Sequence, residues 1–76
     1  MEPILSLQKP TASIGQIQVF PAIYNDLDVL YYPVQVDDWK LAFYLDENTE
    51  WVYRETVILP EIIRQLVGDL IEGYYA

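Results

Sequence analysis

The chain has 76 residues, with twelve acidic residues against four basic ones, a formal net charge of −8, and no cysteine. At this length a single domain is expected, burying about 60–65% of the surface that the unfolded chain exposes. The lack of cysteine excludes disulfides, thiolate metal sites and thiol nucleophiles. Four scattered basic residues cannot neutralise a run of phosphates, so we expect no direct contact with nucleic acid or with an anionic membrane.

Residues 1–13 differ in pattern from the rest of the chain. Pro3 and Pro10 flank a short apolar run, so an N-terminal arm or an edge strand is expected there. Residues 14–76 are expected to form a single α+β domain. The sequence shows neither a basic leader nor an apolar run of about 18 residues, which favours a cytoplasmic protein with no membrane partner.

Apolar and polar side chains alternate between residues 15 and 24, as in a β-strand with one buried face. A two-residue turn at 25–26 would place Phe20 opposite Tyr31 on the next strand. The alternation therefore predicts a strand that pairs with the segment after this turn.

Two prolines conflict with this pairing, because proline lacks the N–H that a central strand uses. Pro21 lies in the first of the two strands and Pro33 in the second. Either a bulge near one of them absorbs the conflict, or strand 14–20 pairs elsewhere and strand 28–36 is an edge. The sequence leaves both alternatives open.

Residues 28–56 alternate through three runs separated by acidic turns, which predicts an antiparallel meander. A two-residue turn would place Val36 opposite Trp39, and a four-residue loop would place Leu45 opposite Glu50. Both registers collect apolar side chains on one face of the sheet, since a slip of one residue would reverse the faces. That face is predicted to carry Leu30, Tyr32, Val34, Val36, Trp39, Leu41, Phe43, Leu45 and Val52.

Apolar residues recur at three- and four-residue spacing from Leu59 to Tyr74, which predicts an amphipathic helix at about residues 60–73. Pro60 suits its first turn, and Gly73 is the expected stop. The apolar face of the meander is the matching cover for this helix. The predicted fold is therefore a two-layer α+β domain, a three- to four-stranded antiparallel β-meander with one C-terminal amphipathic helix packed on one face.

The opposite face of the predicted sheet has no cover within the predicted fold. It is expected to carry a row of aromatic residues, the candidate partner-binding set Phe20, Tyr31, Tyr44, Trp51 and Tyr53. Tyr and Trp are enriched in protein-binding hot spots, and two such faces could also pack together in a homodimer. A stacking platform for single-stranded nucleic acid is disfavoured, because acidic residues flank the row. If the N-terminal arm folds over the row, these residues are ordinary core.

Candidate catalytic and metal-binding groups are weak. The chain has no histidine, and its serine and threonine hydroxyls lack an activating base in a suitable context. Asp37 and Asp38 are adjacent and point apart in a tight turn, so they are not expected to share a proton. Asp46, Asn48 and Glu50 have calcium-loop spacing but lack the glycine and the distant glutamate of an EF-hand. We therefore expect no catalytic residue, no metal site and no cofactor.

These features favour a non-enzymatic protein–protein interaction module, or a small regulatory or accessory subunit, that binds a larger protein through the aromatic face. The net charge of −8 favours a partner with a basic surface. The alternative is an acidic inhibitor that mimics nucleic acid and binds a nucleic-acid-handling protein. One helix cannot cover both sheet faces, so a homodimer is also expected. On this basis a Trp51→Ala, Tyr44→Ala double variant should be a folded monomer.

Overall fold

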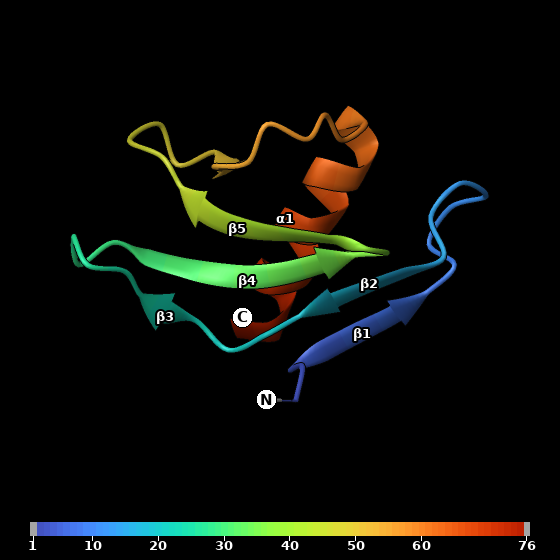
Figure 1. Ribbon diagram of the computed structural model, residues 1–76, viewed down its shortest axis with the longest axis horizontal. Helices are drawn as coiled ribbons and strands as arrows, with labels where there is room; N and C mark the ends of the chain where they lie inside the picture. The colour runs from blue at the N-terminus through green and yellow to red at the C-terminus, as the bar shows by residue number, and fades with distance from the viewer. Residues whose placement is uncertain (1, 76) are drawn as a thin grey trace.

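The computed structural model describes residues 2–75, which form an antiparallel sheet with one helix lying across it (Figure 1). The strands are β1 (Leu5–Gln8), β2 (Gln16–Val19), β3 (Ile23–Tyr24), β4 (Leu30–Val36), β5 (Trp39–Leu45) and β6 (Trp51–Tyr53), and the helix is α1 (Glu61–Tyr75). The order across the sheet is β1-β2-β4-β5-β6, and β3 also pairs with β4. The predicted α+β class is confirmed, but the sheet has six strands rather than three to four.

β1 is an edge strand that pairs antiparallel with β2, with Leu5 opposite Val19. Backbone hydrogen bonds close both ends of this pair, from the Ile4 N–H to the Val19 carbonyl at 2.7 Å and from the Lys9 N–H to the Gly15 carbonyl at 2.8 Å. The N-terminal segment therefore widens the sheet beside β2 and does not lie over the face turned away from α1 (Figure 1).

β2 and β3 run along the same side of β4 and are separated by a bulge. Four residue steps separate Val19 from Ile23, whereas three steps separate their partners on β4, Val34 and Tyr31. The extra residue lies beside Pro21, so the bulge alternative is confirmed and β4 is a central strand.

The same bulge accommodates Pro33. The Phe20 N–H donates to the Pro33 carbonyl at 2.9 Å, so Phe20 lies beside Pro33. The predicted pairing of Phe20 with Tyr31 is therefore wrong, and Ile23 lies opposite Tyr31 instead. In an antiparallel strand the two backbone polar groups of one residue point to the same side. The missing N–H of Pro33 therefore falls where the ladder is already interrupted, and no regular strand hydrogen bond is lost.

The loop before β4 is longer than the predicted two-residue turn because the side chain of Asn25 closes it. The Asn25 Oδ1 accepts the backbone N–H of Leu27 at 2.8 Å and that of Val29 at 3.0 Å. Asp28 takes a positive φ of 59°, which Asp tolerates better than most residues. The resulting loop spans residues 25–29 and leaves Leu27 in solvent.

The β4–β5 register is as predicted, and the β5–β6 register is not. Val36 pairs with Trp39 across the two-residue turn. Leu45, however, pairs with Trp51 instead of Glu50. The slip of one residue exchanges the faces of β6, because side chains alternate along a strand.

The acidic loop between β5 and β6 explains this slip. The Asp46 Oδ1 accepts the N–H groups of Asn48 and Glu50, each at 2.9 Å, and the Asp46 N–H donates to the Glu50 carbonyl at 3.0 Å. Glu50 is therefore held inside a five-residue loop, 46–50, and β6 begins one residue later than predicted.

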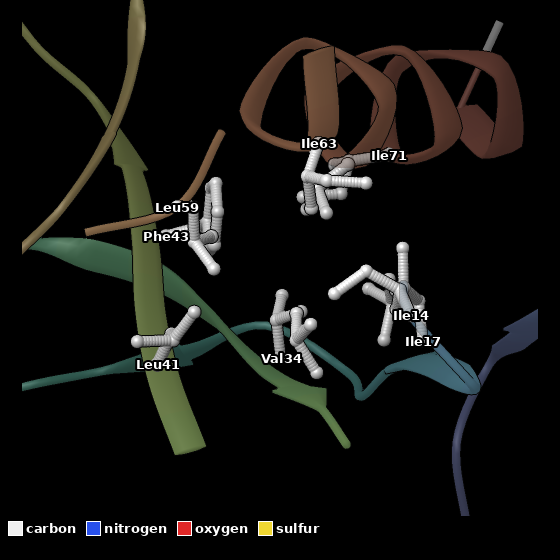
Figure 2. Packing of buried hydrophobic residues seen from close by; sticks show 11 residues of the cluster. Ile14, Ile17, Val34, Leu41, Phe43, Leu59, Ile63 and Ile71 are labelled. Atoms are coloured by element: carbon white, nitrogen blue, oxygen red, sulfur yellow. The ribbon is translucent and has the colours of Figure 1, made fainter. Parts of the chain in front are cut away.

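The core lies between α1 and the sheet face that it covers (Figure 2). Ile63, Val67 and Ile71 form one buried stripe of the helix, at the i, i+4, i+8 spacing of a single helix face. In Figure 2, Ile63 and Ile71 point from the helix toward the sheet. Full burial of one such side chain contributes about 1.5–3 kcal/mol. The rest of the core comes from the strands and from two residues of the loops, Ile14 and Leu59. The strand residues are Ile17, Val19, Val34, Val36, Leu41 and Phe43.

The helix starts and ends close to the predicted residues. The Pro60 carbonyl accepts the N–H groups of Ile63 and Arg64, at 2.9 and 3.2 Å, which places Pro60 just before the first turn. Gly73 does not stop the helix, which continues to Tyr75, because Gly73 does not take a left-handed φ.

Candidate functional site

The aromatic row that the sequence predicts is divided between the two faces of the sheet. Phe20, Tyr31 and Tyr44 lie half-buried on the outer face, the face turned away from α1. Trp51 and Tyr53 pair with residues of the covered face and pack against the core, which corrects their predicted position. The reason is the one-residue slip of β6, which also turns Val52 outward, opposite Tyr44.

Tyr53 closes the core on the side where the chain enters the helix. Its ring lies 5.4 Å from the ring of Phe43, measured between centroids. Its hydroxyl accepts the backbone N–H of Leu59 at 2.9 Å, which fixes the segment before α1. Tyr53 therefore acts in this structure as a packing residue that positions the helix.

Trp51 links the sheet to the C-terminal half of α1. Its ring meets that of Tyr32 edge-on, with centroids 5.7 Å apart and planes inclined by 69°. Its indole N–H donates to Glu72 Oε1 at 2.9 Å. Gly68 provides the space for this contact, since a Cβ there would lie 2.5 Å from Trp51 Cδ1.

Arg64 holds the backbone of β6 from the helix. Its Nη1 donates to the Trp51 carbonyl at 2.6 Å, and it forms an ion pair with Glu61 one turn earlier. The hydrogen bond between the two side chains lowers the pKa of the Glu61 carboxyl and raises the pKa of the Arg64 guanidinium. Arg64 thereby satisfies one backbone carbonyl on the open edge of the sheet, which β6 forms.

Exposed apolar side chains gather where β3 ends, β4 begins and β5 ends. These strand ends lie at the left of the view in Figure 1. The exposed fractions of these side chains lie between 40% and 82%. We call this surface the apolar end; it consists of Tyr24, Leu27, Val29, Leu30 and Leu45. The alternation predicts Leu30 and Leu45 on the covered face, but α1 leaves this end of that face open, and both side chains are exposed.

A pocket of about 410 Å³ opens in the apolar end. Strands and the segment before β4 contribute most of its lining, and α1 contributes Ile71 and Glu72. The complete lining is Val29, Leu30, Tyr32, Leu45, Trp51, Ile71 and Glu72. Glu72 is the only charged residue of this set, so the pocket offers an apolar cavity with one carboxylate at its margin.

A second, polar groove of about 330 Å³ adjoins this pocket and shares Trp51 and Glu72 with it. It lies between the loop before β6 and the exposed side of α1. Its lining is Thr49, Glu50, Trp51, Glu61, Arg64, Gln65, Asp69 and Glu72. Four carboxylates face a single guanidinium there, and that guanidinium is already paired with Glu61. We call this surface the acidic groove.

The outer face joins the apolar end on its other side. A smaller pocket of about 220 Å³ there is lined by Asn25, Leu27, Val29, Tyr31, Tyr44 and Arg54. Leu27 and Val29 therefore connect the apolar end with the outer-face tyrosines Tyr31 and Tyr44. Phe20 lies apart from these residues, in a separate depression beside Pro33 and Lys40.

Groups that bind metals in proteins are not gathered anywhere in residues 2–75, where no set of three or more suitable side chains is close enough to hold an ion. Within the same residues, no helix has the length and apolar character needed to cross a membrane. Comparison with family models, with curated proteins and with solved structures finds no match for this chain.

Proposed function

We propose that this chain is a non-enzymatic interaction module that binds a larger protein through the apolar end. The observation that carries the proposal is the gathering of five large apolar side chains, each at least 40% exposed, at one end of the sheet. Single exposed apolar residues are ordinary, whereas a contiguous group marks a contact surface. A partner that covers the group removes a cost of about 25 cal/mol for each Å² of apolar surface.

Two further features support a protein partner. The adjoining tyrosines, Tyr31 and Tyr44, bring flat amphipathic side chains of the kind enriched at interface hot spots. The net charge of −8 favours a partner whose contact surface is basic. Of the predicted partner-binding residues, Tyr31 and Tyr44 keep this role in the proposal. Trp51 takes part through the pocket, and Phe20 and Tyr53 have no part in it.

Affinity capture tests the proposal with matched variants. We expect the tagged protein to capture a specific partner from cell lysate, and a Leu27→Ser, Val29→Ser variant to lose it. The control is Ile58→Ser, Ile62→Ser, which changes two exposed apolar residues near the start of α1 that are not part of the apolar end. Equal capture by both variants would contradict the proposed surface.

Salt dependence distinguishes the alternative function, mimicry of nucleic acid. Contact through apolar side chains should change little between low and moderate salt, whereas a surface that imitates a phosphate backbone should lose its partner steeply. Capture that disappears with salt, and that is insensitive to the Leu27→Ser, Val29→Ser change, would favour the mimic.

We also propose that the chain forms a homodimer through its outer face. The described residues place no second layer over this face, where Tyr31, Tyr44 and Val52 are only half-buried. In the free protein, before the larger partner engages Tyr31 and Tyr44, a second copy would cover them, and aromatic pairs across such an interface add about 0.5–1.5 kcal/mol each beyond area burial.

A further inference from the structure

We infer that the partner presents to the apolar end a polypeptide segment with an apolar side chain followed closely by Lys or Arg. The apolar side chain fills the pocket, and the basic residue lies in the acidic groove. This inference rests on the proposed function and deepens it, because it states the chemistry of the segment that the module recognises.

The first step of the argument is the shape of the pocket. Its volume of about 410 Å³ lies near the lower end of the range of about 300–1,000 Å³ seen for ligand sites. Tyr32 and Trp51 both line it and pack edge-on against each other, and the cavity is already open in the unbound protein. A preformed cavity suits an anchor side chain, because less ordering entropy is lost on binding.

The second step is the direct connection of this cavity to negative charge. Glu72 belongs to both the pocket and the acidic groove, and the Trp51 indole N–H holds one of its carboxylate oxygens at 2.9 Å. An ionised carboxylate accepts several hydrogen bonds, so Glu72 retains acceptor capacity for a second donor. The carboxylate is thus fixed at the border between the apolar and the acidic surface.

The third step is the charge balance of the acidic groove. Arg64 is bonded to Glu61 and to the Trp51 carbonyl and also lies in the field of Glu50, so four carboxylates share a single guanidinium among the groove residues. An acidic segment entering the groove would meet like charges, and an uncharged one would gain nothing from them. A basic residue is the complementary occupant, and its attraction is strengthened by the overall charge of −8.

A chain segment satisfies both surfaces at once, because its neighbouring side chains can enter the pocket and the groove together. The experiment is a selection of random linear peptides displayed on phage against the purified protein. We expect the enriched peptides to share an aromatic or aliphatic residue followed within a few positions by Lys or Arg. Their addition to the labelled protein should shift the NMR signal of the Trp51 indole N–H.

Two variants separate the role of charge from that of shape. Glu72→Gln keeps an oxygen for the indole N–H but removes the charge, so it should lower the affinity for an enriched basic peptide about two- to fivefold. Asp38→Asn makes the same charge change at the exposed turn between β4 and β5, at the other end of these strands, and should leave the affinity unchanged. Replacing the apolar anchor residue of the peptide by Ser should lower the affinity of the wild-type protein for the peptide more than tenfold.

Several outcomes overturn the inference while leaving the proposed function standing. The first is that the enriched peptides are neutral or acidic beside their anchor residue. The second is that wild type and Glu72→Gln bind an enriched peptide with equal affinity. The third is that no peptide is enriched, although capture of the larger protein still depends on Leu27 and Val29. If no peptide is enriched and capture does not depend on these two residues, the proposed function fails as well.

Discussion

Gly68 shows how one absent side chain determines the packing between layers. A Cβ on residue 68 would lie 2.5 Å from Cδ1 and 2.9 Å from Cγ of the Trp51 side chain. These atoms are near the root of the side chain and pack against the core cluster, so they cannot move aside freely. This close contact explains why residue 68 is glycine, although alanine is the stronger helix former.

Gly68→Ala should therefore destabilise the protein by about 1–3 kcal/mol, although alanine is the better helix former. Gly73→Ala is the matched control in the same helix, since a Cβ there meets nothing within 4 Å. It should leave stability unchanged or raise it by up to about 1 kcal/mol. Urea denaturation of both variants checks this, and a Gly68→Ala protein as stable as wild type would contradict the close contact.

Asp37 joins two turns that are distant in sequence. Its Oδ1 accepts the N–H groups of Gly15 and Gln16, both at 3.0 Å, and its own N–H donates to the Gln16 carbonyl at 3.0 Å. Its backbone takes a positive φ of 52° to reach this position. The β4–β5 turn is thereby fastened to the start of β2.

Asp37→Ala should lower the free energy of unfolding by about 1–3 kcal/mol, because two backbone N–H groups lose a charged acceptor. Asp37→Asn keeps one acceptor oxygen and tolerates positive φ, so a smaller loss is expected. The neighbouring, exposed Asp38→Ala should lose much less. Thermal unfolding monitored by circular dichroism would rank the three variants, and equal melting temperatures for all three would refute the role of Asp37.

At the scale of elements, the sequence predicts a register well only where the turn and the apolar pattern agree. The β4–β5 hairpin meets this condition, because apolar and polar residues alternate on both sides of a two-residue turn. In β6 the three residues Trp51, Val52 and Tyr53 are all apolar, so either register buries an apolar side chain. Only the closure of the loop by Asp46 decides between the two registers, and spacing alone does not reveal it.

The candidate site was predictable in part for the same reason. Tyr31 and Tyr44 lie in well-patterned strands, and their place on the outer face follows from alternation. The apolar end depends on where α1 stops covering the sheet and on a loop whose length the Asn25 side chain sets. These are tertiary features, so Leu30 and Leu45 could not be distinguished from core residues by their spacing.

The position of β6 reverses the expected effect of one substitution. Trp51→Ala should destabilise the protein by about 3 kcal/mol, the lower part of the range for large aromatic residues, because the side chain is half-buried. Tyr44→Ala, on the outer face, should cost about 1 kcal/mol. The double variant is therefore expected to be marginally folded, in contrast to the folded monomer that the sequence predicted. Guanidinium denaturation of both single variants measures the difference, and similar midpoints would argue against the packing of Trp51.

At the scale of the whole molecule, net charge and apolar surface oppose each other in self-association. Two copies each carry a charge of −8, and salt screens their repulsion beyond about 8 Å at physiological ionic strength. We therefore expect a dimer at micromolar concentration that strengthens as salt is added. Sedimentation equilibrium should show a monomer for Tyr31→Ser, Tyr44→Ser and a dimer for the outer-face control Gln18→Ser. A wild-type monomer at every salt concentration would contradict the proposed dimer.

The most direct test of the proposed interaction surface is an NMR comparison of the isotopically labelled protein, free and bound to its captured partner. We predict that the largest changes in amide and methyl signals fall at Leu27, Leu30 and Leu45, with smaller changes along the acidic side of α1. Signals of the 37–38 turn, at the other end of β4 and β5, should stay in place. Changes confined to that turn, with the apolar end unaffected, would contradict the central claim.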